Sequence, residues 1–173
     1  MKHIYIVLTK DITIVSKLIK HIGQVEYSHA SISLSKELDC MFSFGRIYKH
    51  LPLPAGFIVE EFDKGVLADK REVSGVVVDV PVTEEQYNKA KSIIDTFVSN
   101  KEKYSYNTMG LLGNLINKEF VSDDSFYCSE FVYYVLKESG ILNLDIPDGL
   151  VRPNNLLDIK GDVVYKGNLK QIA

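Results

Sequence analysis

Two segments of the chain carry a clear strand pattern, and they differ in which faces they bury. Segment 2–9 is rich in β-branched and aromatic residues, which predicts a strand buried on both faces. Segment 28–35 alternates with a period of two, with apolar residues on one side and His29, Ser31 and Ser33 on the other. It therefore predicts a strand with one apolar face and one face of small hydroxyl groups plus a single imidazole.

The remaining pattern predicts further strands and several helices. The other strands are expected at 40–46, 75–82 and 162–169, and a short one at 57–62 lies within an otherwise irregular connection over 47–75. Apolar spacing of three and four predicts helices at 12–22, 83–99, 106–117 and 126–139. Thr83 and Gln86 form a capping box at the start of the second of these helices, and Gly140 ends the last one.

These elements indicate an α+β fold, with an antiparallel sheet or small barrel against which the helices pack. The chain has 173 residues, of which 46% are hydrophobic, so it can bury a core without disulfides or metals. It contains no repeat, low-complexity tract or linker, which predicts a single domain over 1–173.

Charge and composition exclude several classes of function. A net charge of −3 and a pI near 5.8 argue against nucleic-acid binding, which usually needs a basic face. Two cysteines are too few for a disulfide framework or a thiolate-rich zinc site, so no metal or cofactor is expected. No signal peptide and no apolar run of membrane-spanning length is found, which predicts a cytoplasmic protein with reduced thiols and no stable membrane insertion.

Cys128 is the most informative position for chemistry. It lies at the first turn of the helix expected over 126–139, where Asp124 or Ser125 can cap the chain. The free backbone N–H groups and the helix dipole stabilise a thiolate there and suit a developing oxyanion. The alternative is a small core residue, because Cys128 shares a helical face with Phe131 and Val132.

His29 is the candidate partner of this thiol. Its neighbours on the polar face of the strand, Ser31 and Ser33, are small enough to leave room for a thiol and a substrate. The alternative is a half-exposed strand histidine that makes one hydrogen bond. Cys40 is expected to be structural because it begins an apolar strand, and the Glu60-Glu61 pair is expected on a solvated face, although it could also orient an imidazole.

The motifs YSHASISLS, CMFSFGR and, much later, FYCSEFVYYVLKESG resemble the circularly permuted NlpC/P60 (papain-like) group. That group includes YiiX/YaeF-type amidases and lecithin:retinol acyltransferase-like proteins, and in it the histidine strand precedes the cysteine helix. The resemblance implies that His29 is the general base and Cys128 the nucleophile of a cysteine peptidase or amidase. The family's third, orienting residue lies on the strand after the histidine, where the best-placed polar residue here is Ser43, with Glu60 as a further candidate.

The resulting hypothesis is a cysteine-dependent hydrolase that acts on small peptide or cell-wall-derived amides. Two alternatives of the same fold stay open, a lipid acyltransferase or thioesterase and a non-catalytic module that binds a ligand in the cleft. The irregular segment 47–72 is the segment expected to form a lid.

Overall fold

The computed structural model describes residues 1–10, 26–48, 51 and 54–172, and within them one mixed sheet carries helices on its faces. The strands are β1 Lys2–Thr9, β2 His29–Ser33, β3 Met41–Arg46, β4 Ala55–Glu60, β5 Ser74–Val82, β6 Ser105–Tyr106, β7 Ser125–Phe126 and β8 Asp162–Asn168. The helices are α2 Gly65–Ala68, α3 Glu84–Ser99, α4 Thr108–Leu115 and α5 Cys128–Glu138. The α+β class expected from the sequence is confirmed.

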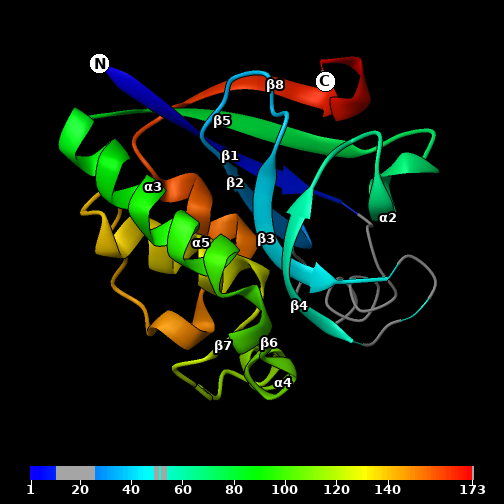
Figure 1. Ribbon diagram of the computed structural model, residues 1–173. Helices are drawn as coiled ribbons and strands as arrows, with labels where there is room; N and C mark the ends of the chain where they lie inside the picture. The colour runs from blue at the N-terminus through cyan, green and yellow to red at the C-terminus, as the bar shows by residue number, and fades with distance from the viewer. Residues whose placement is uncertain (11–25, 49–50, 52–53, 173) are drawn as a thin grey trace.

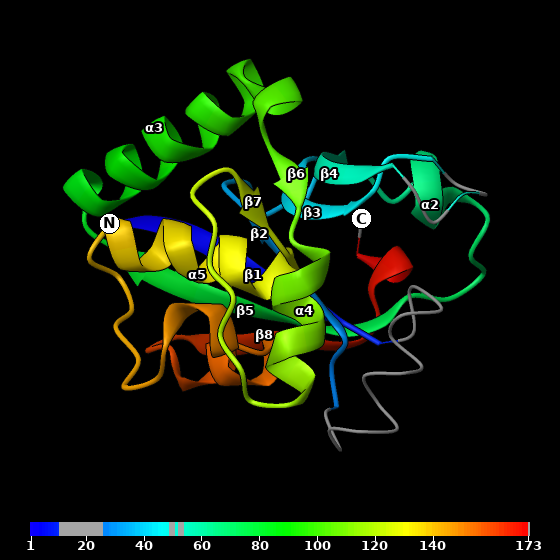
Figure 2. The ribbon, with the colours of Figure 1, turned by 90° about the horizontal axis from the view of Figure 1, so that it is seen from below.

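The strands follow the order β7-β6-β4-β3-β2-β1-β5-β8. Neighbouring strands are antiparallel except for the parallel pair β6–β7. Figures 1 and 2 show α3 and α5 together on one face of this sheet, with α2 and the C-terminal end away from them. In the part of the chain that the structure describes, no helix is both long and apolar enough to cross a membrane.

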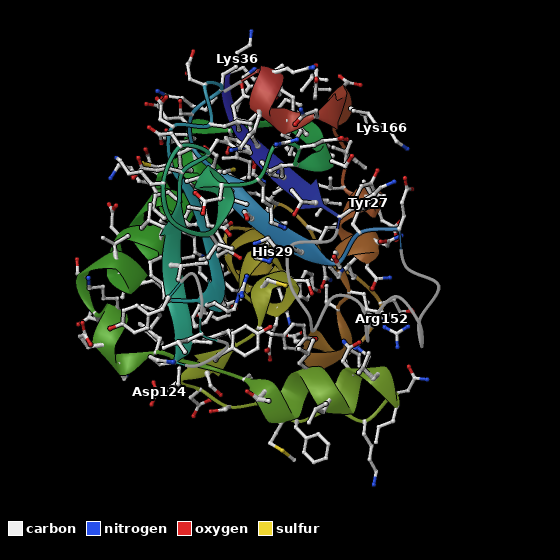
Figure 3. The ribbon with its side chains drawn as sticks, turned by 90° about the vertical axis from the view of Figure 1, so that its right-hand side faces the viewer. Tyr27, His29, Lys36, Asp124, Arg152 and Lys166 are labelled. Carbon is white, nitrogen blue, oxygen red and sulfur yellow. The ribbon has the colours of Figure 1, made fainter. Side chains whose placement is uncertain are left out.

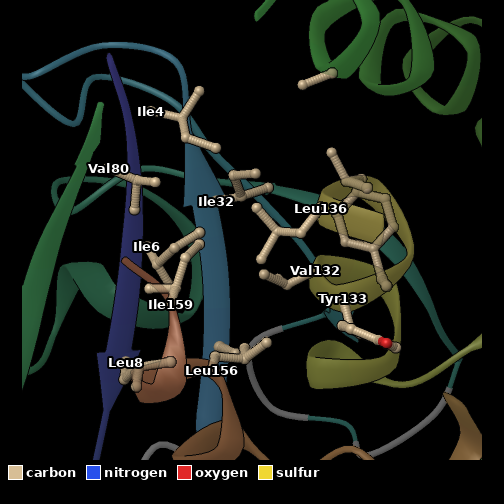
Figure 4. Close-up of a cluster of buried hydrophobic side chains, with 14 of the residues drawn as sticks. Ile4, Ile6, Leu8, Ile32, Val80, Val132, Tyr133, Leu136, Leu156 and Ile159 are labelled. Atoms are coloured by element: carbon tan, nitrogen blue, oxygen red, sulfur yellow. The ribbon is translucent and has the colours of Figure 1, made fainter. Parts of the chain in front are cut away.

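The strand β1 is buried on both faces, as its sequence predicts, and so separates two apolar clusters. Ile4, Ile6 and Leu8 belong to the larger cluster, which includes the inner faces of α3 and α5 (Figure 4). Tyr5 and Val7 belong to the smaller cluster on the opposite face. Because side chains alternate along a strand, one central strand contributes to both cores.

A group of phenylalanines fixes α5 and α3 against the sheet. Its rings lie with centroids 5.0 to 6.0 Å apart, mostly tilted or edge to face, which is the favoured geometry for aromatic pairs. The members are Phe44 of β3, Phe57 of β4, Phe97 of α3, Phe126 of β7 and Phe131 of α5. This packing holds the start of α5 beside the strands that carry the candidate chemistry.

Helix positions agree with the sequence except at some ends. The capping box of α3 is present, with Thr83 Oγ1 accepting from the Gln86 N–H and Gln86 Oε1 accepting from the Thr83 N–H. The last long helix begins at Cys128 and not at Phe126, because Ser125 and Phe126 pair with β6 as a short strand. The helix expected at 12–22 lies outside the described residues.

The connection over 47–75 contains the short strand expected there, as β4, shifted by two residues from 57–62. It also contains the four-residue helix α2, which the sequence did not predict. Cys40 precedes β3 and is exposed, so it does not belong to the core.

Candidate functional site

The candidate site is built where β2 begins, beside the first turn of α5. His29 is the first residue of β2 and pairs with Thr9 of β1, while Ser31 pairs with Val7. The alternation of the strand places His29 and Ser31 on one face, with Ala30 and Ile32 packed into the larger core on the other. His29 is 9% exposed, so it is buried and not half-exposed.

A carboxylate from a distant part of the sheet contacts this imidazole. His29 Nε2 lies 3.0 Å from both Oε1 and Oε2 of Glu60, the last residue of β4. The Ser31 hydroxyl also donates to Glu60 Oε2. Glu60 is itself 9% exposed, whereas its neighbour Glu61 pairs with Lys64 near the surface. The buried carboxylate is thus partnered by both polar side chains that β2 turns toward it.

The charges of this buried pair stabilise each other. Burial alone would lower the pKa of His29, but the Glu60 carboxylate and a hydrogen bond with Cys128 raise it to about 10. Burial alone would raise the pKa of Glu60, but the charge of His29 and the hydrogen bonds from His29 and Ser31 hold it below its ordinary value. At neutral pH the pair is therefore an imidazolium and a carboxylate.

Cys128 occupies the first helical position of α5. Tyr127 is the N-cap, with an extended backbone at φ −105° and ψ 172°. The N–H groups of Cys128 and Ser129 belong to the first turn of the helix and so have no acceptor within it. The thiol therefore lies at the positive end of the helix dipole, beside free backbone donors.

The thiol of Cys128 meets the imidazole of His29 at this point. Cys128 lies close enough to His29 to contribute, after Glu60, to the raised pKa of the imidazole. Since Nε2 faces Glu60, Nδ1 is the ring nitrogen left for the thiol. Figure 3 shows His29 beside the ribbon of α5, with Arg152 toward α4. The structure thus brings together two residues that are 99 positions apart in the sequence.

The loop after α5 braces both sides of the site. The Ser129 hydroxyl donates to the Val151 carbonyl at 2.8 Å, and the Tyr127 hydroxyl lies 3.2 Å from the same oxygen. Asn154 Oδ1 accepts from the Tyr27 N–H at 3.0 Å, two residues before His29. One short segment therefore anchors the start of the cysteine helix and the approach to the histidine strand.

A second set of hydrogen bonds fixes the N-terminus of α5 from the side of α4. Glu130 Oε2 accepts from the Tyr127 N–H at 3.1 Å and lies 3.4 Å from Asn107 Nδ2. Asn114 Nδ2 donates to the Tyr127 hydroxyl, and Arg152 Nε donates to Asn114 Oδ1, both at 2.8 Å. A reacting group needs a fixed position of this kind, because small displacements of reacting atoms lower the rate of the chemical step.

Tyr106 is a residue beside the thiol that the sequence did not single out. Burial, together with the nearby Cys128, Tyr127 and Glu130, raises its pKa well above the ordinary value. Its phenol therefore stays protonated at neutral pH and can donate a hydrogen bond. In the sequence Tyr106 is only the first residue of the helix expected at 106–117, whereas in the structure it ends the two-residue strand β6.

Of the two candidates for the orienting residue, Glu60 contacts His29, whereas Ser43 bonds elsewhere. The Ser43 hydroxyl donates to the Ala30 carbonyl at 2.7 Å, and no hydrogen bond to His29 is found for it among the described residues. Glu60 was a secondary candidate in the sequence, and its expected place on a solvated face is wrong.

The arrangement places a thiol and an imidazolium next to the backbone donors at the start of α5. Within the described ranges, no group of three or more His, Cys, Asp or Glu side chains is placed to hold a metal ion. Models of known protein families, curated proteins and solved structures were each searched, and none matches this chain. The interpretation of the site therefore depends on its geometry.

Proposed function

We propose that this protein is a cysteine-dependent hydrolase with an amidase or peptidase activity, in which Cys128 is the nucleophile. The observation that carries the proposal is the position of His29, which contacts a thiol on one side and the buried carboxylate of Glu60 on the other. A nucleophile, a base and an orienting acid in contact are the recurring constellation of acyl-transfer catalysis.

The protonation state suggests how the reaction starts. With a pKa of about 10, His29 holds its proton at neutral pH and places this positive charge near the sulfur of Cys128. The thiolate attacks the substrate carbonyl carbon, forming a C–S bond and an oxyanion. The N–H groups at the start of α5 stabilise this oxyanion, with the Tyr106 phenol as a further donor.

Collapse of the oxyanion breaks the bond to the leaving group. The imidazolium of His29 gives its proton to the departing amine, which leaves a thioester on Cys128 and a neutral imidazole. His29 then takes a proton from water as the water attacks the thioester, and cleavage of the C–S bond restores the thiolate and the imidazolium. Glu60 keeps the ring oriented and stabilises its charged form in both steps.

The order of the elements supports membership of the permuted NlpC/P60 (papain-like) group. The histidine strand β2 precedes the cysteine helix α5 in the chain, and the proline-containing segment from Arg152 follows that helix. The strand after His29 carries no acidic residue, which by itself would favour a non-catalytic binding module. The carboxylate that Glu60 brings from β4 supports the hydrolase instead. Small peptide or cell-wall-derived amides are the substrates we propose.

The proposal is tested by alkylation of the native protein with iodoacetamide across pH, mapped separately to Cys128 and to the exposed Cys40. Rapid labelling of Cys128 well below pH 8, slowed strongly in His29→Ala, is expected. His3→Ala is the matched control, because His3 also pairs with a carboxylate, Asp79, but on the surface. Cys128 is only 6% exposed, so a thiol that reacts only after unfolding would show a core cysteine and refute the proposal.

A substrate screen over amides and esters follows a positive result. The expected hit is a peptide amide, including γ-linked and isopeptide amides, whose hydrolysis is lost in Cys128→Ala and retained in Cys40→Ala. Hydrolysis that survives Cys128→Ala would contradict the mechanism. Turnover of lipid esters with no turnover of amides would instead favour the acyltransferase or thioesterase alternative.

A further inference from the structure

A pocket lies on the side of α5 opposite the candidate site. Successive helical residues are about 100° apart, so Glu130 and Tyr134 point about 200° and 240° away from Cys128 around the helix axis. Both residues line the pocket, together with residues of α3 and of the 121–123 segment. Neither Cys128 nor His29 contributes to it. The pocket is therefore separate from the site of the proposed chemistry.

The size and lining of this pocket suit a small organic molecule. Its volume is about 420 Å³, within the range of roughly 300–1,000 Å³ found for ligand pockets. Such pockets are mostly apolar and aromatic, with a few polar groups that select the ligand. Here the apolar part is a wall of aromatic rings, and the polar part is dominated by carboxylates.

The aromatic wall is made of stacked and crossed rings. Tyr104 stacks on Phe97 with centroids 4.2 Å apart, and Tyr134 meets Phe126 at 5.3 Å and Phe97 at 6.0 Å. The faces of such rings attract cations. Two tyrosines that line the pocket already have a lysine ammonium over the ring. Lys103 Nζ lies 5.8 Å from the ring centroid of Tyr104, and Lys137 Nζ lies 5.9 Å from that of Tyr133.

The charged groups that line the pocket are all acidic. They are Asp123, Glu130 and Asp148, and among the residues that the structure describes no lysine or arginine lines the pocket. Lys137 partly compensates Asp148 by an ion pair of 2.7 Å. Glu130 is 4% exposed and faces the pocket from the base of α5. An anion would be repelled here. A neutral ligand would desolvate the carboxylates without offering them a positive charge, and this desolvation costs free energy.

We propose that this pocket binds an organic cation, an ammonium group whose alkyl or aryl body lies against the rings of Phe97, Tyr104 and Tyr134. Asp123 supplies most of the charge complementarity, because Asp148 is paired with Lys137 and burial raises the pKa of Glu130 to about 7. The rings supply apolar contact and cation–π attraction. Neither Cys128 nor His29 lines this pocket, and Glu130 links the two places, because it lines the pocket and also accepts from the Tyr127 N–H at the start of α5.

The test compares two probes of the same shape and different charge, choline and 3,3-dimethylbutan-1-ol. Each is titrated into the ¹⁵N-labelled protein, and the amide resonances are followed by NMR. Choline is expected to shift the amide resonances of Phe97, Tyr104, Glu130 and Tyr134 in a saturable manner. The neutral alcohol is expected to bind at least about tenfold more weakly than choline. Equal binding of the two probes would overturn recognition of the cation.

Variants locate the binding. Tyr134→Leu and Asp123→Asn are each expected to weaken choline binding several-fold, because the first removes a ring and the second a charge. Tyr87→Leu and Asp95→Asn are the matched controls on α3, outside the pocket lining, and should bind choline as the native chain does. Asp123 lies in a loop, so Asp123→Asn keeps the test valid if Tyr134→Leu does not fold. Shifts confined to other regions, or none at 50 mM choline, would refute the site.

Discussion

Replacing Glu60 by Gln tests the electrostatic basis of the site directly. The change keeps the shape of the side chain and removes its charge, so the buried imidazole of His29 loses its counter-ion. Glu60 acts on His29 both through its charge and through a hydrogen bond. Because an opposite charge in contact is worth about 1–3 pKa units, we expect the pKa of His29 to fall from about 10 to about 8.

This change has a predictable effect on stability. A histidine whose pKa is raised on folding stabilises the folded state fully below its unfolded pKa of 6.5, and this stabilisation is lost as the pH rises toward 10. For the native chain the loss between pH 6.5 and 10 is about 4 kcal/mol, at about 1.4 kcal/mol per pKa unit. In Glu60→Gln the same contribution is only about 2 kcal/mol and is lost mostly below pH 8.5.

Two measurements check this prediction. NMR titration of the imidazole carbon resonances, assigned with His29→Ala, gives the pKa of His29 in each variant. Urea unfolding at several pH values gives the difference in the free energy of unfolding between native and variant proteins. Glu61→Gln is the matched control, since Glu61 carries the same group one residue further and pairs with Lys64 at the surface. A His29 pKa that stays near 10 in Glu60→Gln, or equal effects of both variants, would refute the reasoning.

Three further predictions concern the surroundings of the site. Tyr106→Phe removes a donor near Cys128 and should lower kcat about 100-fold with little change in KM, if the phenol stabilises the oxyanion; an unchanged kcat on the substrate found by screening would exclude that role. Asn154→Ala removes the acceptor of the Tyr27 N–H and should cost about 1 kcal/mol in urea unfolding; no loss would show that the bond contributes nothing. Burial raises the pKa of Glu130 to about 7, so its ionisation destabilises the fold as the pH rises above its unfolded value of 4.5. Glu130→Gln should therefore gain about 3 kcal/mol relative to the native chain between pH 4.5 and 7.5, and a pH-independent difference would contradict this.

The sequence predicts the elements of this fold well where the pattern is local. β1, β2, β5 and α3 lie within one or two residues of the predicted segments, because period-two alternation and a capping box are read from neighbouring residues. The start of α5 was misplaced by two residues, since the pairing of Ser125 and Phe126 with β6 is a tertiary contact that overrides the helical pattern. The true start makes Cys128 the first helical residue.

The third residue of the site could not be predicted from local pattern. Ser43 is polar and lies on the expected strand, yet its hydroxyl donates a hydrogen bond to the Ala30 carbonyl of the neighbouring strand. Glu60 and Glu61 are identical in type, and only the alternation of β4 decides which of them is buried. That alternation becomes informative only once the register of β3 and β4 is known, which pairs Met41 with Glu60.

The burial of His29 and Glu60 itself favours a chemical role for the pair. Removing two charges from water is costly, and replacing a buried ion pair by apolar residues is often neutral or stabilising, so stability alone is a weak reason for it. The neighbours on this face, Ser31 and Val7, are small enough that apolar side chains would pack there. The imidazolium also contacts Cys128, the first residue of a helix braced by its own loop. A charged imidazole held between a carboxylate and a thiol is what acyl transfer needs, and we therefore favour the hydrolase over a structural cysteine.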